Sequence, residues 1–290
     1  MAFPKISIIT PSFNQAHYLE FTIKSILDQN YPNLEYIIID GGSTDGSVDI
    51  IKKYEKHLAY WISEPDQGLY FALHKGLSKS TGEIMGWLNS DDMLHKLSLF
   101  TLADIFSNIA QVNWVQGLPT IFDEMGRTTY TTQPPLKSKY NYYLKDYRKT
   151  PFAFIQQEST YWRRSLWEAA GGYISQEYRL AGDFELWMRF FQKDTLYFTQ
   201  ALIGGFRVRK ENQLSRNNFS EYLSEVGTII NKIELSEEDK KVLRSIKLYR
   251  KCTHYIPLLK LNTYLHDSYQ ALFEVPPLIR FDTDKQQFII

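Results

Sequence analysis

Two adjacent carboxylates, Asp91 and Asp92, follow an apolar run at residues 84–88. A second apolar run, at residues 34–39, ends in the same way at Asp40, which begins a turn rich in glycine and serine. Carboxylate oxygens are the ligands that Mg²⁺ and Mn²⁺ prefer, because both are hard cations. The pattern therefore indicates an oxygen-lined site for a divalent metal and a nucleotide.

Each of these acidic residues also has a purely structural interpretation, which stays open on these residues alone. Asp91 and Asp92 would cap a helix beginning near His95, because Asp is a preferred helix cap. Asp40 would start the turn that the glycines after it continue. Asp66 stands in a Pro-Asp-Gln-Gly segment, which is equally typical of a turn.

Two further acidic residues precede predicted helices. Asp45 comes before the helix expected at residues 47–54, and Asp183 starts a helix expected over residues 184–191. Both positions favour a cap, since an Asp side chain accepts hydrogen bonds from the free N–H groups of a helix start. The case for chemistry therefore depends on the order and spacing of all these signals together.

Strands and helices alternate along the first part of the chain. We expect strands at residues 6–10, 34–39, 58–62 and 84–88 and helices at residues 19–27, 47–54 and 69–78. The strand-like runs are apolar almost throughout, which is typical of strands buried on both faces of a parallel sheet. The expected fold is α/β with a mainly parallel sheet, Rossmann-like and flanked by helices. Ligands of such sheets bind beyond the carboxyl ends of the strands, which places the acidic segments at one edge.

The second half of the chain is less regular. We expect a helix and strands over residues 98–133, a loop over the site at 134–150, charged helices at 222–232 and 237–251, and a hairpin over 278–290. The change to charged helices marks a boundary. We therefore divide the chain into an α/β domain of residues 1–216 and a C-terminal helical extension of residues 217–290.

The composition excludes several classes of protein. The 290 residues are 43% apolar and 15% aromatic, which is ample for a packed core. Thirty-three basic and 33 acidic residues cancel, so the charge predicts no nucleic-acid partner. The single cysteine, Cys252, excludes an internal disulfide framework. We find no signal-peptide pattern and no apolar run near the ~20 residues that span a bilayer, so we expect a cytoplasmic protein, at most peripheral on the inner face of the cell membrane.

Three segments resemble the signature segments of the family 2 glycosyltransferases. They read IITPSFN at residues 8–14, IDGGSTDGS at 39–47 and GWLNSDD at 86–92. A weaker likeness continues through residues 157–164, 169–173 and 183–189, and it fades after about residue 215. Within that family the chain resembles bacterial enzymes that build O-antigen, colanic acid and related surface polysaccharides.

The resemblance implies a GT-A fold and a nucleotide-sugar donor, which we expect to be a UDP-sugar. The acceptor would be a glycan or a lipid-linked saccharide. The match assigns the loop along the nucleotide to Pro11, Ser12 and Phe13. It assigns the reading of the base to Asp40 and a further contact near the donor to Asp66.

The resemblance also implies a divalent metal, Mn²⁺ or Mg²⁺, and inversion at the anomeric carbon. Asn89-Ser90-Asp91 matches the family motif written Asp-any-Asp, with Asp91 and Asp92 as candidate metal ligands. Asp183 matches the catalytic base. Inversion in one displacement needs a base for the proton of the acceptor hydroxyl and an electrophile on the departing diphosphate, which are the roles of Asp183 and the metal.

The chain departs from the family pattern at three places. Asn89 replaces the first acid of the motif, although its amide oxygen still offers a ligand. Phe71 and His74 stand where relatives more often have Asp and Asn. Near Arg209, relatives often place a histidine that binds the metal. Two alternatives stay open: a nucleotide- or glycan-binding protein that has lost catalysis, and a nucleotidyltransferase, although no glycine-rich phosphate loop follows Ile9.

One predicted helix carries a row of basic residues opposite an apolar face. The basic residues are Lys240, Lys241, Arg244, Lys247 and Lys251, and the apolar face carries Val242, Ile246 and Tyr249. This pattern is most typical of a solvated helix face or a dimer contact. It is also compatible with peripheral contact with an anionic membrane.

Overall fold

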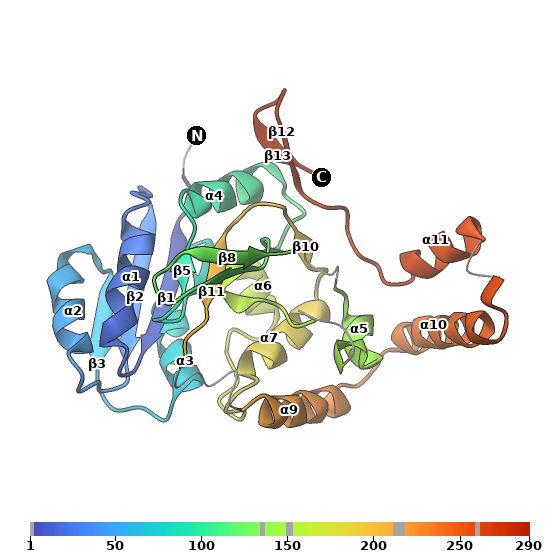
Figure 1. Cartoon of the computed structure of the whole chain (residues 1–290), viewed down its shortest axis with the longest axis horizontal. Coiled ribbons are helices and arrows are strands. Elements are labelled where there is room, and N and C mark those ends of the chain that lie inside the picture. The colour runs from blue at the N-terminus through green and yellow to red at the C-terminus, as the bar shows by residue number, and fades with distance from the viewer. Residues whose placement is uncertain (1–2, 134–136, 149–152, 211–217, 259–261) are drawn as a thin grey trace.

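A seven-stranded sheet with helices on both faces forms the centre of the molecule (Figure 1). The computed structural model describes residues 3–133, 137–148, 153–210, 218–258 and 262–290. The sheet has the order β10-β6-β9-β4-β1-β2-β3, with β1 (Ile6–Ser12), β2 (Leu34–Asp40), β3 (Tyr60–Ser63), β4 (Ile84–Trp87), β6 (Trp114–Gln116), β9 (Thr160–Arg163) and β10 (Tyr197–Phe198). Strand β9 runs antiparallel to β4 and β6, and the other neighbouring pairs are parallel. The prediction of an α/β fold with a mainly parallel sheet is confirmed.

The two faces of the sheet pack against different helices, because successive strand residues point to opposite faces. Ile8 and Ile38 face one core cluster, which is completed by α1 (Ala16–Leu27), α2 (Ser47–Tyr54) and α4 (Ser98–Asn108). Ile9 and Ile39 face the other, which is completed by α3 (Leu69–Lys79), α6 (Arg164–Ala169), α7 (Gly182–Phe191) and α9 (Phe219–Lys232). The helices predicted at residues 47–54, 69–78 and 184–191 are all present.

A smaller sheet lies beside the carboxyl end of β4. Its order is β5-β11-β7-β8, with β5 (Met93–Leu94), β11 (Gly204–Arg207), β7 (Thr120–Phe122) and β8 (Thr128–Thr131). Glycine is required at position 204, because a Cβ there would lie 2.0 Å from the carbonyl oxygen of Glu158 in the 3₁₀ helix η3 (Gln157–Ser159). Because β11 lies so close to η3, Arg209, which follows β11, reaches the turn that carries Asp91.

Two local predictions are corrected by the structure. The helix expected near His95 begins only at Ser98, because Met93 and Leu94 pair with β11 as strand β5. The segment expected to be a loop at residues 134–150 contains the short helix α5 (Lys139–Tyr143) and the 3₁₀ turn η2 (Asp146–Arg148). At the start of α5, the N–H of Ser138 donates to the side-chain oxygen of Asn141 at 2.9 Å. Both ends of that predicted loop lie outside the described residues.

The C-terminal part of the chain divides into segments that pack differently. Helix α9 carries Val226, Ile229 and Ile230 into the larger core cluster. Helices α10 (Glu237–Tyr255) and α11 (Thr263–Ala271) project from the body (Figure 1). The strands β12 (Arg280–Asp282) and β13 (Gln287–Ile289) then pair antiparallel. The predicted domain boundary at residue 216 lies outside the described residues and stays a prediction. In the described part of the chain, none of the helices has the length and apolar character needed to cross a membrane.

Candidate active site

The carboxyl ends of β1, β2 and β3 lie side by side, with Ser12, Asp40 and Ser63 in register. The buried carboxylate of Asp40 accepts a hydrogen bond at Oδ2 from the Ser63 hydroxyl, at 2.7 Å. It also accepts from the backbone N–H of Ser43 at 2.8 Å and of Gly42 at 3.1 Å, and from the Ser43 hydroxyl at 2.6 Å. These bonds give Asp40 the turn-forming role that its sequence context favours, and its contact with a base stays a prediction.

The loop after β1 is tied to the loop after β2. The N–H of Asn14 donates to the Ser43 hydroxyl at 2.8 Å, and the N–H of Ala16 donates to Asp45 at 2.9 Å. Asp45 also accepts from the N–H of Ser47 at the start of α2, but the N-cap position is Gly46, so Asp45 is not the cap that the sequence predicted. The loop therefore has a fixed shape.

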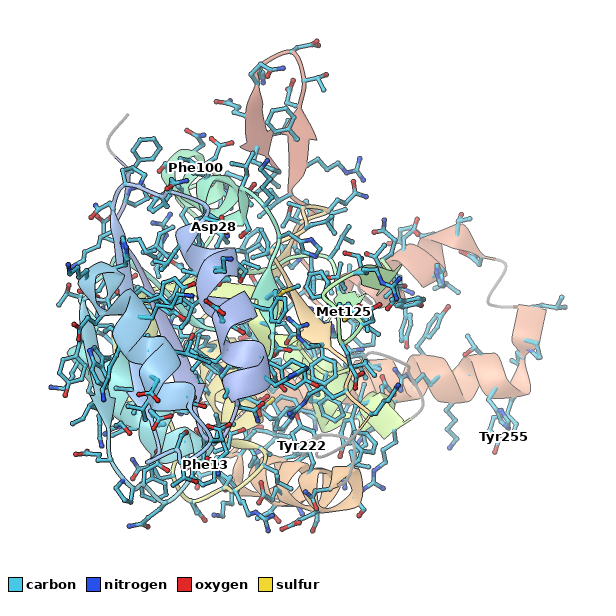
Figure 2. The ribbon with its side chains drawn as sticks, turned by 60° about the vertical axis from the view of Figure 1, so that its left-hand side comes forward. Phe13, Asp28, Phe100, Met125, Tyr222 and Tyr255 are labelled. Carbon is cyan, nitrogen blue, oxygen red and sulfur yellow. The ribbon has the colours of Figure 1, made fainter. Side chains whose placement is uncertain are left out.

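Three residues of the loop region were assigned to the nucleotide by resemblance. Pro11 and Ser12 are buried at the end of β1, whereas the Phe13 side chain is 60% exposed at the surface (Figure 2). Within the described part of the chain, the buried Ser12 hydroxyl has no hydrogen-bond partner. A buried hydroxyl without a partner is unfavourable, so Ser12 has a hydrogen bond to offer a ligand.

Asp66 lies in the loop before α3. Its Oδ1 accepts from the N–H of Gly68 at 2.8 Å, which fixes the turn that the sequence predicts. A pocket of about 690 Å³ beside α3 is lined by Asp66, Phe71 and His74 among others. Phe71 and His74, the two departures from the family pattern in α3, therefore belong to the wall of a pocket beside Asp66.

Asp92 is wholly buried, and both of its carboxylate oxygens are used within the protein. Oδ1 accepts from the N–H of Arg207 at 2.9 Å, and Oδ2 accepts from the amide nitrogen of Asn89 at 3.2 Å. Burial and the charges of Asp91 and Glu158 raise the pKa of Asp92 well above its usual range. Since the next helix begins at Ser98, the alternative that Asp91 and Asp92 cap a helix is wrong.

Asp91 carries an ion pair that the sequence did not predict. Its Oδ2 lies 3.0 Å from Nη2 of Arg209, and the two side chains are 15% and 11% exposed. Burial raises the pKa of Asp91, and the guanidinium groups of Arg209 and Arg207 oppose that rise. Arg207, wholly buried, donates from Nε to the Asp91 carbonyl at 2.6 Å and from Nη1 to the Glu124 carbonyl at 2.7 Å.

Asp183 lies in the first turn of α7 and is held from two sides. Its Oδ1 accepts from the backbone N–H of Phe184 at 2.7 Å and from the hydroxyl of Tyr70 at 3.1 Å. Tyr70 belongs to the first turn of α3, which follows the carboxyl end of β3. Burial raises the pKa of Asp183 to about 6. Asp183 therefore stands at the same edge of the sheet as the other acidic residues, with a pKa close to neutral pH.

Glu158 is an acidic residue that the sequence analysis missed as a site residue. Its side chain is buried in η3, with the residue 3% exposed, and Oε1 has no hydrogen-bond partner among the described residues. Burial raises the pKa of Glu158 to about 8, and the negative charges of Asp91 and Asp183 act in the same direction. The charges of Asp91 and Asp183 therefore both act on this one buried carboxyl group. Local periodicity holds no signal of this, because η3 is positioned by β9, which pairs with β4 and β6, and by the close approach of Gly204 in β11.

The oxygen atoms near Asp91 suit a hard divalent cation. Among the described residues, Asn89 Oδ1 is buried and has no hydrogen-bond partner. The same residues contain no group of three or more His, Cys, Asp or Glu side chains that could hold a metal by themselves. Mg²⁺ is commonly bound by one or two carboxylates together with substrate phosphates, so a shared site of this kind fits the residues present.

The fold is similar to that of solved GT-A glycosyltransferases. The crystal structure of S. aureus TarS 1-349 in complex with UDP-GlcNAc superimposes with a TM-score of 0.63 at 19% identity, covering 82% of this chain and 70% of TarS 1-349. Mannosyltransferase PcManGT from Pyrobaculum calidifontis, in complex with GDP-Man and Mn²⁺, gives a TM-score of 0.61 at 19% identity, with 94% and 74% covered. These likenesses establish the fold.

The chain belongs to glycosyl transferase family 2, whose model matches residues 7–169, more than half of the chain. The putative teichuronic acid biosynthesis glycosyltransferase TuaG of Bacillus subtilis is 42% identical over 98 residues, which cover 32% of this chain and 38% of TuaG. The uncharacterized glycosyltransferase RT0329 of Rickettsia typhi is 25% identical over 228 residues, covering 76% and 69%. The first three curated relatives are matched over only 34–38% of their own length.

Proposed function

We propose that this glycosyltransferase moves a sugar, with inversion, from a nucleotide-sugar donor to a glycan or lipid-linked saccharide of a bacterial surface polysaccharide. The observation that carries the proposal is the environment of Asp183, a half-buried carboxylate at the ligand-binding edge of the sheet with a pKa of about 6. A UDP-sugar is the donor we propose, in line with the UDP-GlcNAc bound to TarS. The teichuronic acid role suggested for TuaG supports a surface polysaccharide.

Asp183 would act as the general base. A base with a pKa near 6 is ionised at neutral pH yet can still bind the proton of an attacking hydroxyl. Tyr70 and the N–H of Phe184 hold Oδ1 in a fixed orientation, which leaves Oδ2 for the acceptor. The Asp183 carboxylate would thus take the hydroxyl proton as the oxygen of the acceptor attacks the anomeric carbon.

The nucleotide would lie along Pro11, Ser12 and Phe13. The Ser12 hydroxyl is buried and lacks a partner among the described residues, and the Phe13 ring is exposed, so one offers a hydrogen bond and the other a stacking surface. Asp40 would then set the shape of the loop that holds the base. A direct contact of Asp40 with the base would require one of its present hydrogen bonds to break. Asp66 would contact the donor near the pocket beside α3.

A divalent metal, Mn²⁺ or Mg²⁺, would neutralise the diphosphate of the leaving nucleotide. Asp91 and the amide oxygen of Asn89 are the ligands we propose. We assign Asp92 a positioning role instead, because its two oxygens hold the N–H of Arg207 and the Asn89 amide. In this arrangement Asp92 fixes the turn that presents Asp91.

We also propose that the enzyme works at the cytoplasmic face of the membrane, where lipid-linked acceptors are found. Supporting this proposal, the basic residues Lys240, Lys241, Arg244, Lys247 and Lys251 are all exposed on α10. Leu248, Tyr255 and Ile256 are exposed apolar residues on or next to the same helix. The apolar face predicted for this helix is not free for a membrane, because Ile246 is wholly buried and packs in a cluster with Tyr140 and Phe273. The proposal therefore depends on the basic row and on these other exposed apolar residues.

The test of the function is donor turnover by wild-type protein and by Asp183→Asn. We expect transfer or slow hydrolysis of UDP-GlcNAc or another UDP-sugar, and a loss of about 10²- to 10⁴-fold in the variant because the base is removed. UDP binding, followed by calorimetry, should be unchanged because Asn keeps the oxygen that Tyr70 and Phe184 contact.

The matched control is Asp49→Asn, the same change at a highly exposed position on α2. It should leave turnover at the wild-type level. Near-normal transfer by Asp183→Asn would contradict the assignment of the base. Donor binding without any turnover by the wild-type protein would instead favour the alternative of a binding protein that has lost catalysis.

A further inference from the structure

The guanidinium group of Arg209 joins two parts of the site that are far apart in the sequence. Nη2 lies 3.0 Å from the carboxylate of Asp91, and Nη1 donates to the Gln15 side chain at 3.1 Å. The group also lies over the ring of Tyr18, 5.4 Å from its centre. Gln15 ends the loop after β1, so Arg209 places a positive charge between that loop and the turn of Asp91.

This charge alters what Asp91 can bind. Two opposite charges in contact attract strongly where water is largely excluded, and both side chains are at least four-fifths buried. A divalent cation that approaches the same carboxylate meets the guanidinium charge at close range, and the buried guanidinium of Arg207 adds to the repulsion. Asp91 is therefore already neutralised by the protein itself, which makes it a weak site for a metal ion alone.

The same guanidinium is well suited to a diphosphate. Its planar set of N–H donors matches the oxygens of a phosphate group, and such charge-assisted bonds are stronger than neutral ones. Arg209 reaches the end of the β1 loop, at the edge where α/β sheets bind ligands. A diphosphate in that position would offer Arg209 at least two negative charges, whereas Asp91 offers one.

We propose that Arg209 binds the diphosphate of the donor and competes with divalent metal for Asp91. Without a donor, Arg209 occupies the Asp91 carboxylate. When the diphosphate enters, Arg209 moves to the phosphate oxygens, and Asp91 becomes available. Metal and nucleotide then bind cooperatively, although each binds weakly alone. This inference rests on the proposed nucleotide-sugar donor and adds to it the residue that recognises the diphosphate.

The first test measures Mn²⁺ binding without nucleotide, by electron paramagnetic resonance or calorimetry. We expect Arg209→Gln to bind Mn²⁺ about 10- to 100-fold more tightly than wild type, because the competing charge is gone. Arg209→Lys keeps the charge and should resemble wild type. The control is Arg127→Gln, which removes a largely exposed arginine from an ion pair with Asp123, and it should have no effect.

The second test measures binding of UDP and of inorganic pyrophosphate in EDTA. Arg209→Gln should weaken both about 10- to 100-fold, since a charged hydrogen-bonding group is lost. Asp91→Asn should strengthen pyrophosphate binding, because the Arg209 guanidinium no longer pairs with a carboxylate. Asp91→Asn also keeps the proposal testable if Arg209→Gln fails to fold, which thermal unfolding would reveal.

The outcomes separate this inference from the proposed function. Equal binding of UDP and pyrophosphate by wild type and Arg209→Gln would overturn the role of Arg209 and leave the donor class standing. Weaker pyrophosphate binding by Asp91→Asn would overturn the competition. If wild-type protein binds neither UDP nor pyrophosphate, with or without Mn²⁺, the nucleotide-diphosphate donor is wrong and the role of Arg209 falls with it.

Discussion

The acidic residues of the site differ in how completely the protein satisfies them. The Asp40 carboxylate accepts four hydrogen bonds, including two from backbone N–H groups. Asp183 accepts two, both at the same oxygen, and Glu158 Oε1 accepts none from the described residues. The pKa is raised to about 6 for Asp183 and to about 8 for Glu158. Satisfied carboxylates shape the loops, and the less satisfied ones are available for chemistry.

The raised pKa of Asp183 predicts the pH dependence of transfer. Burial disfavours the charged form, so this carboxyl keeps its proton up to a pH of about 6. A base must be ionised to accept a proton, so kcat/KM should rise as the pH rises through about 6 and level off above it. Initial rates from pH 5 to pH 8 at saturating metal would check this expectation. A rate that does not change over this range would show that a group of lower pKa is the base.

The candidate site residues that the sequence singled out stand in local patterns, whereas those that it missed depend on contacts between segments far apart in the sequence. Asp91 and Asp183 stand within local patterns, a strand end and a helix start, so a single sequence can locate them. The pairing of Arg209 with Asp91 depends on β11 lying against β5, and the burial of Glu158 depends on a different contact of β11, that of Gly204 with η3. Local periodicity carries no information about which distant strands pair. The departure from the family pattern at Arg209 was visible, but its partner was not.

At the scale of elements, helix α9 supports the segment that leads into the proposed base. Glu225 accepts hydrogen bonds from three consecutive backbone N–H groups, those of Arg179 at 3.1 Å, Leu180 at 2.9 Å and Ala181 at 2.7 Å. Tyr70 adds a contact to the Leu180 carbonyl at 2.8 Å. The segment before α7 is thus held by Glu225 of helix α9 and by Tyr70 of helix α3.

Glu225→Ala should therefore impair both stability and transfer. Three backbone N–H groups lose a charged acceptor, so the free energy of unfolding should fall by about 1–3 kcal/mol, as measured by urea denaturation. The orientation of Asp183 should loosen, which should lower kcat more than it raises KM. Glu221→Ala is the control, since Glu221 makes only a partly exposed ion pair with Arg179 at 3.5 Å. Equal effects of the two variants would contradict the positioning role of Glu225.

The regular elements were predicted well because their patterns are local. Helix α2 begins and ends at the predicted residues 47 and 54, and β2 ends at Asp40. The strand β5 was missed because two residues form no pattern of their own and are held only by β11. Helix α5 was hidden by the turn-like composition around it, although Tyr140 and Tyr142 are buried in the structure. Tertiary packing decided these cases.

At the scale of the whole molecule, the projecting helix α10 is the part that we expect to meet a membrane. Wild-type protein should sediment with anionic liposomes at low salt and release at high salt, because the attraction of exposed charges is screened. The double variant Lys247→Glu with Lys251→Glu should bind less. The matched control, Lys52→Glu with Lys56→Glu, reverses two exposed charges near α2 and should bind like wild type. Loss of binding in both variants would indicate that only the net charge matters.

The position of Ile279 has a consequence for how the chain is made. Strand β10 is an edge strand of the seven-stranded sheet. Ile279 covers its free edge and donates a hydrogen bond from its N–H to the Phe198 carbonyl at 2.8 Å. Thr199 and Ile279 form an isolated parallel bridge there. During synthesis, β10 emerges from the ribosome long before the segment around Ile279 that covers it. An uncovered edge strand is a template for pairing with other chains. The growing chain therefore exposes this edge until the segment around Ile279 has been made, and only the finished contact covers it.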